Sequence, residues 1–483
     1  MSKTVLAFDF GASSGRAIKA RFDPCAAQPL SLTEVHRFDN TPVERDGFLT
    51  WDFDRLMEEI AAGFDKAGMV DSVGFDSWGV DFGLLDANGR LIAAPVHYRD
   101  GYTAGTMEEA AERMPPDALF EATGLQMLSF NTLFQLLAVR RRRPDIWARA
   151  DKLLFMPDLF RYALGGPVCC DTTVACTSQM LDPRTGQWHR DVLERYGIPE
   201  SLLPPIRKSG SLLTKVRGIP SILVAGHDTQ SAVTAMPVRP EEADEAAFVS
   251  CGTWSLFGCE LDRPILTPES RKAGLSNELG ADGRIHYLKN ISGLWLIQES
   301  RREWRRQGRE YSYADLERLA LDAEPRRSFI DPDAPDFVPP GDIPGRVQAY
   351  CAKTGQPVPQ SAGEIMRCIY ESLAMKYRVA LDQFSRMTGR TFRVLHLLGG
   401  GAKDRLLCQL TADSLGIPVV AGPAEATALG NVILQLIALG ELPDIAAGRR
   451  LIRQTQPLRT VGPNPTPGLN KAYARYTAML ESE

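Results

Sequence analysis

Short apolar runs that end in polar turns recur along the first part of this chain. Residues 4–12 (TVLAFDFGA), 16–22 and 32–38 have the length and apolar content of strands, and the first carries Asp9 near its end. Residues 53–67 differ, because their apolar side chains recur every three or four positions, which predicts a helix. A further strand is predicted at 72–76. The pattern therefore predicts an α/β protein that opens with several strands.

The second half repeats this order. Residues 246–258 form an apolar run with the polar tip CGTWS, similar to the first strand and its tip, so we interpret the two as a weak internal duplication. Two segments, 169–180 and 274–290, show little periodicity and are expected to be loops, the first covering a cleft. Helices are predicted at 131–150 with a break near Pro144, and at 158–164, 231–236, 293–306, 362–387, 405–415, 427–439, 444–453 and 469–480; strands are predicted at 392–398 and 417–421.

Length adds domain organisation to this picture. A chain of 483 residues is long for one hydrophobic core, so two large domains are expected. Residues 238–245 (VRPEEADE) are polar and acidic and contain a proline, which is typical of a linker. The predicted division is an N-terminal domain at 1–240, a C-terminal domain at 246–443 and a helical extension at 444–483.

Charge and cysteine content exclude several classes of function. A net charge of −5 gives no basic surface for nucleic acid, and we expect no membrane interaction because no apolar run reaches spanning length and no leader is recognisable. The nine cysteines are scattered, which favours a reducing cytoplasm with thiols as small core residues; Cys351 and Cys368 could lie near each other. The six histidines lack metal-ligand spacing, and nothing indicates an oligomeric state.

The turn after the first strand is a candidate phosphate site. Ala12, Ser13, Ser14 and Gly15 are small enough to let backbone N–H groups approach an anion, and Arg16 can pair with a phosphate. Asp9 is placed to hold Mg²⁺ through water. The alternative is a plain β-hairpin whose glycines serve the turn.

The stretch AGHDTQSAV (225–233) is the candidate catalytic element. Gly226 allows a sharp exit from a buried strand, and His227, Asp228 and Thr229 follow just before a predicted helix. A carboxylate at such a turn is well placed to accept a proton. The alternative is that Asp228 only caps the helix.

Two further turns contain residues suited to small ligands. Trp78 and Gly79 follow a strand and suit a pocket wall, although these residues alone favour a buried core tryptophan beside a turn glycine. Three consecutive glycines at 399–401 are more than a strand-to-helix turn needs, and they let a flat ring approach the backbone.

Eight stretches in this order resemble the FGGY carbohydrate kinases over nearly the whole chain. They read DFGASSGR (9–16), DSWGVDF (76–82), FNTLFQL (130–136), GHDT (226–229), CGTWS (251–255), LKNISGLWLIQ (288–298), LLGGGAKD (397–404) and AGPAEATALGN (421–431). The resemblance implies an α/β fold of two actin-like/ribonuclease-H-like ATPase domains with a catalytic cleft between them.

The same resemblance implies roles for individual residues. Asp228 matches the base that takes a proton from the primary hydroxyl of the sugar, and Asp9 matches the residue that holds Mg²⁺ through water. The sugar-contacting positions are matched by Gly79, His227, Asp228, Thr229 and Asn290. The ATP-contacting positions are matched by Ala12, Ser13, Ser14, Gly15, Arg16, Thr253, Gln298 and Gly400.

The implied reaction is ATP-dependent phosphorylation of a ketose. The wordings WGVDF, HDT and GTWS point to the deoxy-ketohexose branch of the family. WGVDF and GTWS favour L-rhamnulose as the acceptor at O1, whereas GHDTQ would also suit L-fuculose, so L-fuculose or another ketose is the alternative in the same family. A sugar- and nucleotide-binding regulator without catalysis is the alternative from another class, and the joint presence of Asp9, Arg16 and Asp228 argues against it. The sequence departs from related kinases at 101–102 and 279–286, which leaves the exact sugar open.

Overall fold

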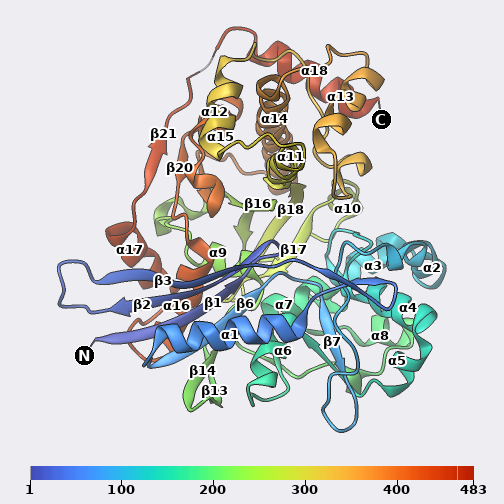
Figure 1. The fold of residues 1–483 in the computed structure, drawn as a ribbon, viewed down its shortest axis with the longest axis vertical. Helices are drawn as coiled ribbons and strands as arrows, with labels where there is room; N and C mark the ends of the chain where they lie inside the picture. The colour runs from blue at the N-terminus through green and yellow to red at the C-terminus, as the bar shows by residue number, and fades with distance from the viewer. Residues whose placement is uncertain (1, 465, 483) are drawn as a thin grey trace. The chain divides into compact units, whose positions relative to one another are not determined.

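The computed structural model describes residues 2–464 and 466–482, which form two compact, interleaved units. Unit 1 comprises the chain up to Arg239 together with Glu260–Leu288 and Ala426–Gln456. Unit 2 comprises Pro240–Cys259, Lys289–Glu425 and the chain from Pro457 onward. Each unit contains a β-sheet with flanking helices (Figure 1). The predicted ranges 1–240, 246–443 and 444–483 stay a prediction.

The sheet of unit 1 gathers three parallel strands at its centre. Its order is β13-β14-β6-β1-β2-β3. Both β1 and β14 run parallel to β6, whereas β2, β3 and β13 pair antiparallel with their neighbours. The strands are β1 (Lys3–Phe10), β2 (Ser14–Phe22), β3 (Leu30–Asp39), β6 (Ser72–Ser77), β13 (Ser211–Val216) and β14 (Ile219–Leu223). Parallel pairing puts the carboxyl ends of β1, β6 and β14 at one edge of the sheet.

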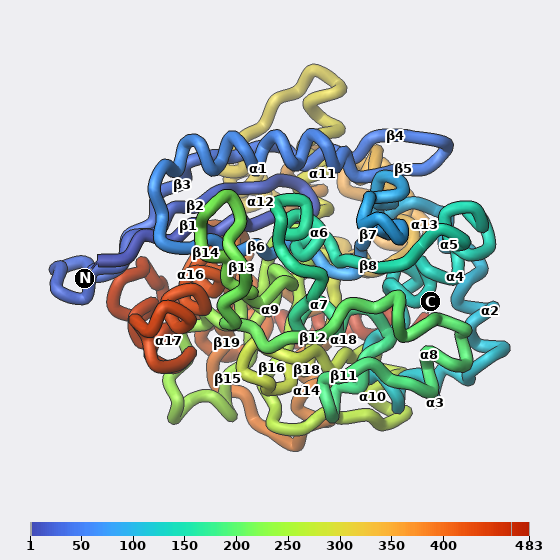
Figure 2. Tube along the Cα trace, turned by 90° about the horizontal axis from the view of Figure 1, so that it is seen from below, coloured from blue at the N-terminus to red at the C-terminus, as the bar shows by residue number. Residues whose placement is uncertain are grey.

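Helices cover both faces of this sheet. On one face lies α1 (Phe53–Ala67), whose Phe64 ring is 5.0 Å from that of Phe8. On the other lie α16 (Ala426–Ala438) and α9 (Asp228–Thr234), with α16 packed on the β1 side chains of Val5 and Ala7. Figure 2 shows β1 between α1 and α16. Val5 and Ala7 face α16 and Phe8 faces α1, because alternate side chains of a strand point to opposite faces of the sheet.

Unit 2 is built around a second sheet and a long helix. The order of the sheet is β17-β18-β16-β15-β19-β20-β21, in which β15, β19 and β20 run parallel. Its helix α14 (Ala362–Thr388) begins with a Ser361–Glu364 capping box and ends at Gly389 in the left-handed conformation. The other elements are β15 (Ala246–Cys251), β16 (Trp254–Leu261), β17 (Ser276–Leu279), β18 (Ile285–Ser292), β19 (Val394–Leu398), β20 (Val419–Ala421), β21 (Arg459–Val461), α11 (Trp295–Arg306) and α15 (Arg405–Leu415). The β17 strand and the first half of β18, up to Leu288, belong to unit 1.

Smaller elements complete the chain. The short strands are β4 (Val43–Arg45), β5 (Phe48–Thr50), β7 (Phe82–Leu85), β8 (Lys152–Phe155), β9 (Cys170–Asp171), β10 (Leu181–Asp182), β11 (Gln187–Trp188) and β12 (Ile206–Arg207). The remaining α-helices are α2 (Thr106–Arg113), α3 (Pro116–Thr123), α4 (Thr132–Arg142), α5 (Pro144–Arg149), α6 (Met156–Ala163), α7 (Thr172–Ala175), α8 (Arg190–Tyr196), α10 (Pro268–Lys272), α12 (Tyr313–Asp322), α13 (Ile343–Lys353), α17 (Ile445–Thr455) and α18 (Leu469–Glu481). The predicted break near Pro144 is confirmed, because α4 ends at Arg142 and α5 begins at Pro144.

Two predicted loops are wrong. Residues 169–180 are almost entirely buried and contain β9 and α7, so they are not a loop over a cleft. Residues 274–290 contain β17 and most of β18. Both segments bury polar residues, such as Asp171 and Glu278, that bond to distant parts of the chain. A polar residue at a buried position erases the periodicity from which a strand is predicted.

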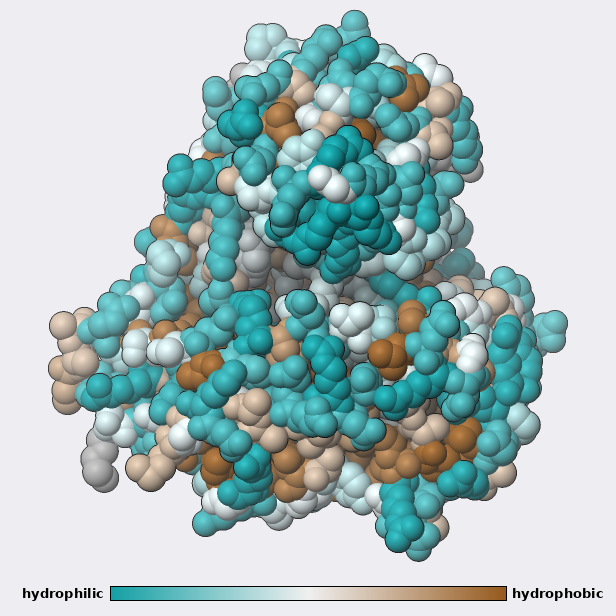
Figure 3. All heavy atoms as spheres, in the orientation of Figure 1, coloured by the Kyte–Doolittle hydropathy of each residue, from teal (hydrophilic) through white to brown (hydrophobic). Residues whose placement is uncertain are grey.

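The cysteines are free and mostly lie in the core. Eight of the nine cysteines are buried and all nine, Cys351 and Cys368 included, are free. Within the described residues, no helix is both long and apolar enough to cross a membrane. Figure 3 shows hydrophilic side chains gathered over α11, where Arg302, Arg305 and Arg306 are exposed.

A substitution in α16 tests the packing that positions α9. A Cβ atom on Gly430 would lie 1.8 Å from the backbone oxygen of Ser231 in α9, so Gly430→Ala must push the two helices apart. We expect a loss of about 1–3 kcal/mol of stability, measured as the urea midpoint of unfolding. The control is Gly462→Ala, which has no atom within 4 Å and should change the midpoint little. Equal midpoints for the two variants would contradict the helix packing.

Candidate functional site

Three carboxylates gather at the carboxyl edge of the unit 1 sheet. Asp9 near the end of β1 is in register with Asp76 near the end of β6. The Trp78 amide donates to the Phe10 carbonyl at 3.1 Å, and the Ser77 amide donates to the Gly226 carbonyl at 2.8 Å. The turn that carries Asp228 is thereby pinned beside the ends of β1 and β6. The structure brings together Asp9 and Asp228, both predicted from the sequence, with Asp76, which was not.

Asp228 is the first residue of α9 and not its cap. His227 occupies the N-cap position and makes no side-chain cap bond. The Thr229 amide donates to Oδ1 of Asp228 at 2.6 Å, and 28% of the Asp228 side chain is exposed. Asp228 is therefore not the N-cap residue, but its carboxylate still satisfies an amide of the first turn, so a helix-terminal role is retained beside the proposed one. The carboxylate is anchored through one oxygen and open enough to meet a ligand.

The surroundings of Asp228 shift its acidity. Burial, reinforced by the charge of Asp9, raises the pKa of Asp228 to about 6, while His227 opposes the shift. The carboxylate is thus ionised at neutral pH and has a higher proton affinity than an ordinary aspartate. A base must start ionised, and it accepts a proton more readily as its pKa approaches the working pH.

The segment predicted to be a loop at 169–180 holds the GHDT turn in place. Oδ1 of Asp171 accepts from the Gly226 amide at 3.1 Å, and Oγ1 of Thr173 accepts from the His227 amide at 3.2 Å. Oδ2 of Asp171 in turn accepts from the hydroxyls of Thr173 and Ser209, each at 2.7 Å. The backbone of the turn is therefore fixed by buried, charge-assisted bonds.

The small-residue turn between β1 and β2 is closed by its own backbone. The Gly11 amide donates to the Ser14 carbonyl at 2.9 Å, and Nδ2 of Asn40 donates to the Gly11 carbonyl at 3.0 Å. A Cβ on Gly15 would overlap the Phe38 ring, so that position needs glycine. Arg16 forms an ion pair with Asp9. The turn is a β-hairpin, and its half-buried residues Ala12, Ser13 and Ser14 remain a predicted phosphate site.

The carboxylates at this edge suit a hydrated divalent cation. Oδ2 of Asp76 accepts from Nδ2 of Asn431 at 2.6 Å, whereas its buried Oδ1 has no hydrogen-bond partner. Burial, with the charge of Asp9, raises the pKa of Asp76. No group of three or more His, Cys, Asp or Glu side chains among the described residues could enclose a metal ion. Mg²⁺ held by Asp9 through water stays a prediction, and its chemistry allows such a site because Mg²⁺ keeps several of its waters.

Gly79 lies beside a rigid aromatic layer. Asp81 accepts hydrogen bonds from the indole nitrogens of Trp51 at 2.7 Å and Trp78 at 3.0 Å. Trp78 is buried and its ring lies 4.0 Å from that of Trp51, so it is a core residue. A Cβ on Gly79 would come within 2.9 Å of Thr177, which leaves only glycine at this half-exposed turn.

Two predicted nucleotide residues meet in unit 2. The backbone oxygen of Thr253, at the tip between β15 and β16, accepts from the Trp295 amide at 3.1 Å. Its hydroxyl donates to Oε1 of Gln298 on α11 at 3.4 Å. The tip is therefore docked on the first turn of α11, which brings Thr253 and Gln298 together.

The three glycines after β19 differ in their surroundings. A Cβ on Gly401 would lie 2.3 Å from Sγ of Cys251, and Gly399 has a φ of +81° against the Cys251 backbone. Gly400 is exposed and has no atom within 4 Å of a Cβ position. Packing explains two of the glycines, and the open surface at Gly400 is the part that suits a ligand.

Asn290 is the predicted sugar contact that the structure assigns to unit 2. It lies in the second half of β18, whereas Gly79, His227, Asp228 and Thr229 lie in unit 1. Burial, with the nearby charge of Lys376, lowers the pKa of the adjacent Lys289 to about 8. Lys289 donates to Oε1 of Gln383 at 3.1 Å.

Several residues around the site were not predicted. Asp76 is the last residue of a predicted strand, and Asp9 lies near the end of another, so the same strand-end argument could have found Asp76. Asp171 and Glu278 could not have been found in this way, because they lie in segments that were expected to be loops.

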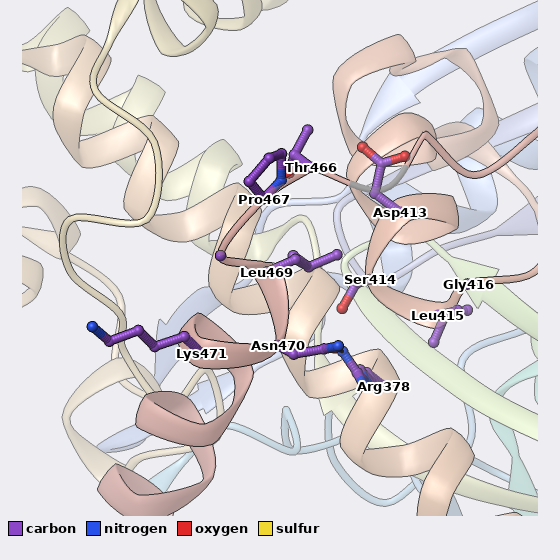
Figure 4. A pocket seen from close by; sticks show the side chains of 11 residues that line it. Arg378, Asp413, Ser414, Leu415, Gly416, Thr466, Pro467, Leu469, Asn470 and Lys471 are labelled. Carbon is purple, nitrogen blue, oxygen red and sulfur yellow. Dashed lines mark hydrogen bonds between the residues drawn. The ribbon is translucent and has the colours of Figure 1, made fainter.

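A pocket of about 480 Å³ lies elsewhere in unit 2 (Figure 4). It is lined by Arg378 of α14, the end of α15 and the start of α18, and Arg378 donates to Asn470 at 3.1 Å. None of its lining residues is a predicted nucleotide contact. It therefore adds nothing to the candidate site.

Comparison with known proteins supplies the family context. Residues 4–233 match the N-terminal domain of the FGGY family of carbohydrate kinases, and residues 247–439 match its C-terminal domain. A rhamnulokinase of Bacteroides thetaiotaomicron is 39% identical over 490 residues, covering 99% of each chain. A rhamnulokinase of Enterococcus faecalis is 39% identical over 495 residues, covering 99% of this chain and 98% of the relative.

Solved structures share the fold at low identity. A xylulose kinase from Lactobacillus acidophilus superposes with a TM-score of 0.77 at 17% identity, covering 99% of this chain and 96% of that one. A gluconate kinase from the same organism gives 0.76 at 16% identity, covering 100% and 97%. The prediction of two α/β domains of the actin-like/ribonuclease-H-like class is confirmed.

Proposed function

Since this chain belongs to the FGGY family of carbohydrate kinases, we propose that it transfers a phosphoryl group from ATP to O1 of L-rhamnulose, giving L-rhamnulose 1-phosphate and ADP. The observation that carries the proposal is Asp228, ionised at neutral pH and pinned beside Asp9 and the β1–β2 turn. Full-length similarity to two rhamnulokinases supports the choice of sugar.

Asp228 is proposed as the base. Its carboxylate takes the proton of the O1 hydroxyl while that oxygen forms a bond to the γ-phosphorus and the bond from phosphorus to the bridging oxygen of ADP breaks. The proton then passes from Asp228 to solvent. Sugar contacts are proposed for Gly79, His227, Thr229 and Asn290, which orient the hydroxyl in line with the phosphorus.

The nucleotide contacts are proposed for residues of both units. Arg16 and the small-residue turn supply donors for phosphate oxygens, and Gly400 leaves room for the nucleoside. Mg²⁺, held by Asp9 through water, supplies neutralisation of phosphate charge when it is bound. The full proposed set is Ala12, Ser13, Ser14, Gly15, Arg16, Thr253, Gln298 and Gly400.

The proposed setting is a reducing cytoplasm. The free and mostly buried cysteines support it, because disulfides persist in oxidising compartments. The proposed partners are the ketose and ATP, without nucleic acid or membrane.

A substrate panel tests the proposed reaction. ADP release is measured with L-rhamnulose, L-fuculose, L-ribulose, D-xylulose and glycerol, and we expect the highest kcat/KM for L-rhamnulose. A higher kcat/KM for L-fuculose would instead assign the chain as an L-fuculose kinase of the same family. Near-zero turnover on all five would refute a kinase of these sugars and favour a binding regulator.

Removing the base should separate binding from turnover. Asp228→Asn keeps the size of the side chain but cannot accept the proton, so kcat should fall by about 10²–10⁴-fold with little change in sugar binding. The measurement combines ADP release with calorimetric titration of the sugar. A kcat near the wild-type value would rule out Asp228 as the base.

The pH profile should report the shifted acidity of Asp228. Because its pKa is about 6, log(kcat/KM) should fall with unit slope below about pH 6, and not near pH 4 as for an ordinary aspartate. The profile is measured from pH 5 to 8 with the coupling enzymes in excess at each pH. A flat profile down to pH 5 would contradict the assignment.

A further inference from the structure

A chain of buried polar side chains extends from Asp228 into the core of unit 1. Nε2 of His227 lies 3.5 Å from Oδ1 of Asp228, and Nδ1 of His227 lies 3.0 Å from Oε2 of Glu278. Nδ1 makes no well-aligned hydrogen bond, so its attraction to Glu278 is that of an ion pair. The His227 side chain is 10% exposed and that of Glu278 is 4% exposed. The imidazole thus stands between two carboxylates, one from α9 and one from β17.

Gln230 fixes the position of Glu278. Its Nε2 donates to Oε2 of Glu278 at 2.6 Å, and its Oε1 contacts Nδ1 of His286. The orientation of the amide follows from chemistry, because an ionised carboxylate only accepts hydrogen bonds. Oε1 of Gln230 must then accept a hydrogen bond from Nδ1–H of His286. This leaves the Glu278 oxygen facing His227 with an amide donor on its other side.

The far end of the chain is anchored by an ion pair. The guanidinium of Arg449 donates to both oxygens of Glu260, at 2.7 and 3.1 Å, and Nε2 of His286 lies 3.4 Å from the same carboxylate. Although burial opposes it, Arg449 lowers the pKa of Glu260 and keeps that group ionised. His286 is therefore held from both sides, so the amide of Gln230 cannot turn over freely.

The charge on His227 follows from what surrounds it. Burial is the largest single influence and opposes the imidazolium, but Glu278, Asp228 and Asp171 together outweigh it, so the pKa of His227 is raised. The other charged groups that face it are Asp228 and Asp171, both acidic. Without Glu278, only Asp228 and Asp171 would remain to oppose the lowering of the His227 pKa by burial.

We propose that Glu278 is a positioning residue for catalysis: held by Gln230, it keeps His227 as an imidazolium whose Nε2–H faces Asp228. The cation holds Asp228 ionised and in one orientation, and it presents a donor beside the base. This inference rests on the proposed role of Asp228. A merely structural Glu278 would support folding without affecting the charge on His227.

Histidine NMR tests the charge directly and needs no turnover. The full chain labelled with ¹⁵N-histidine is titrated from pH 5 to 9, and the His227 signal is assigned by its loss in His227→Gln. We expect His227 to titrate above pH 6.5, and its midpoint to fall by about 1–3 pH units in Glu278→Gln. Glu278→Asp, which retains the carboxylate, should recover part of that shift.

The pH profile connects this charge to the reaction. In Glu278→Gln, the acid limb of kcat/KM should move upward by about one pH unit, because Asp228 loses the cation that favours its ionised form. Turnover at pH 6 should then fall about five-fold, and turnover at pH 8 should change little. The matched control is Glu371→Gln in unit 2, which replaces another carboxylate of 4% exposure, bonded to Arg367 at 2.7 Å. The control should leave both the His227 titration and the acid limb in place.

The outcomes separate this inference from the proposed function. Wild-type protein that turns over none of the five substrates refutes the kinase assignment, while the His227 titration still decides the charge. An unshifted His227 midpoint in Glu278→Gln overturns the inference even in an active enzyme. If Glu278→Gln does not fold, a wild-type His227 that is neutral at pH 7 overturns it, and a cationic one supports it. If Glu278→Gln shifts the titration midpoint of His227 but leaves the acid limb of kcat/KM in place, the charge on His227 does not act on Asp228, and the positioning role is refuted.

Discussion

The parallel pairing of β1 and β14 with β6 is the constraint on which the site depends. It brings the carboxyl ends of three strands to one edge, and the bonds from Trp78 to Phe10 and from Ser77 to Gly226 fix their register. Asp9, Asp76 and Asp228 meet there although about 150 residues of chain separate the last two. Helices on both faces bury the sheet, so the strand ends cannot slide without breaking the core.

Gathering like charges is costly unless each has a partner, and the surrounding residues can be understood from that requirement. Arg16 pairs with Asp9, Asn431 donates to Asp76, and His227 faces Asp228. At Asp76 and Asp228 the partner favours the ionised form of the carboxylate against burial. The compensation is incomplete at both Asp76 and Asp228, whose pKa values stay raised, and at Asp228 this leaves the proton affinity that a base requires. The crowding of carboxylates that costs folding free energy therefore also raises the pKa of the proposed base.

Much of this arrangement could be predicted from the sequence, for a local reason. A strand such as β1, a helix such as α1 and a turn such as GHDT each depend on neighbouring residues, so periodicity and turn composition reveal them. The supporting residues are different. Asp171 bonds to Gly226, and Glu278 bonds to Gln230, across about 50 residues in each case. Their polar side chains sit at buried positions that a pattern of apolar residues assigns to a loop. A contact between residues about 50 positions apart produces no periodic pattern of apolar residues, so a single sequence does not reveal it.

The interleaving of the units explains why these supports are remote. Glu260–Leu288 returns to unit 1 after the chain has entered unit 2, and Ala426–Gln456 returns a second time. The first return brings Glu278, His286 and Glu260, and the second brings Asn431 and Arg449. Both returns therefore supply polar partners to the site: Asn431 bonds to Asp76, and Glu278 pairs with His227 beside Asp228. Arg449 pairs with Glu260 at the far end of the same chain of contacts. Because the same segments also fill the core beneath α9 and β1, the folding of unit 1 and the ionisation of its acidic edge are coupled through one set of contacts.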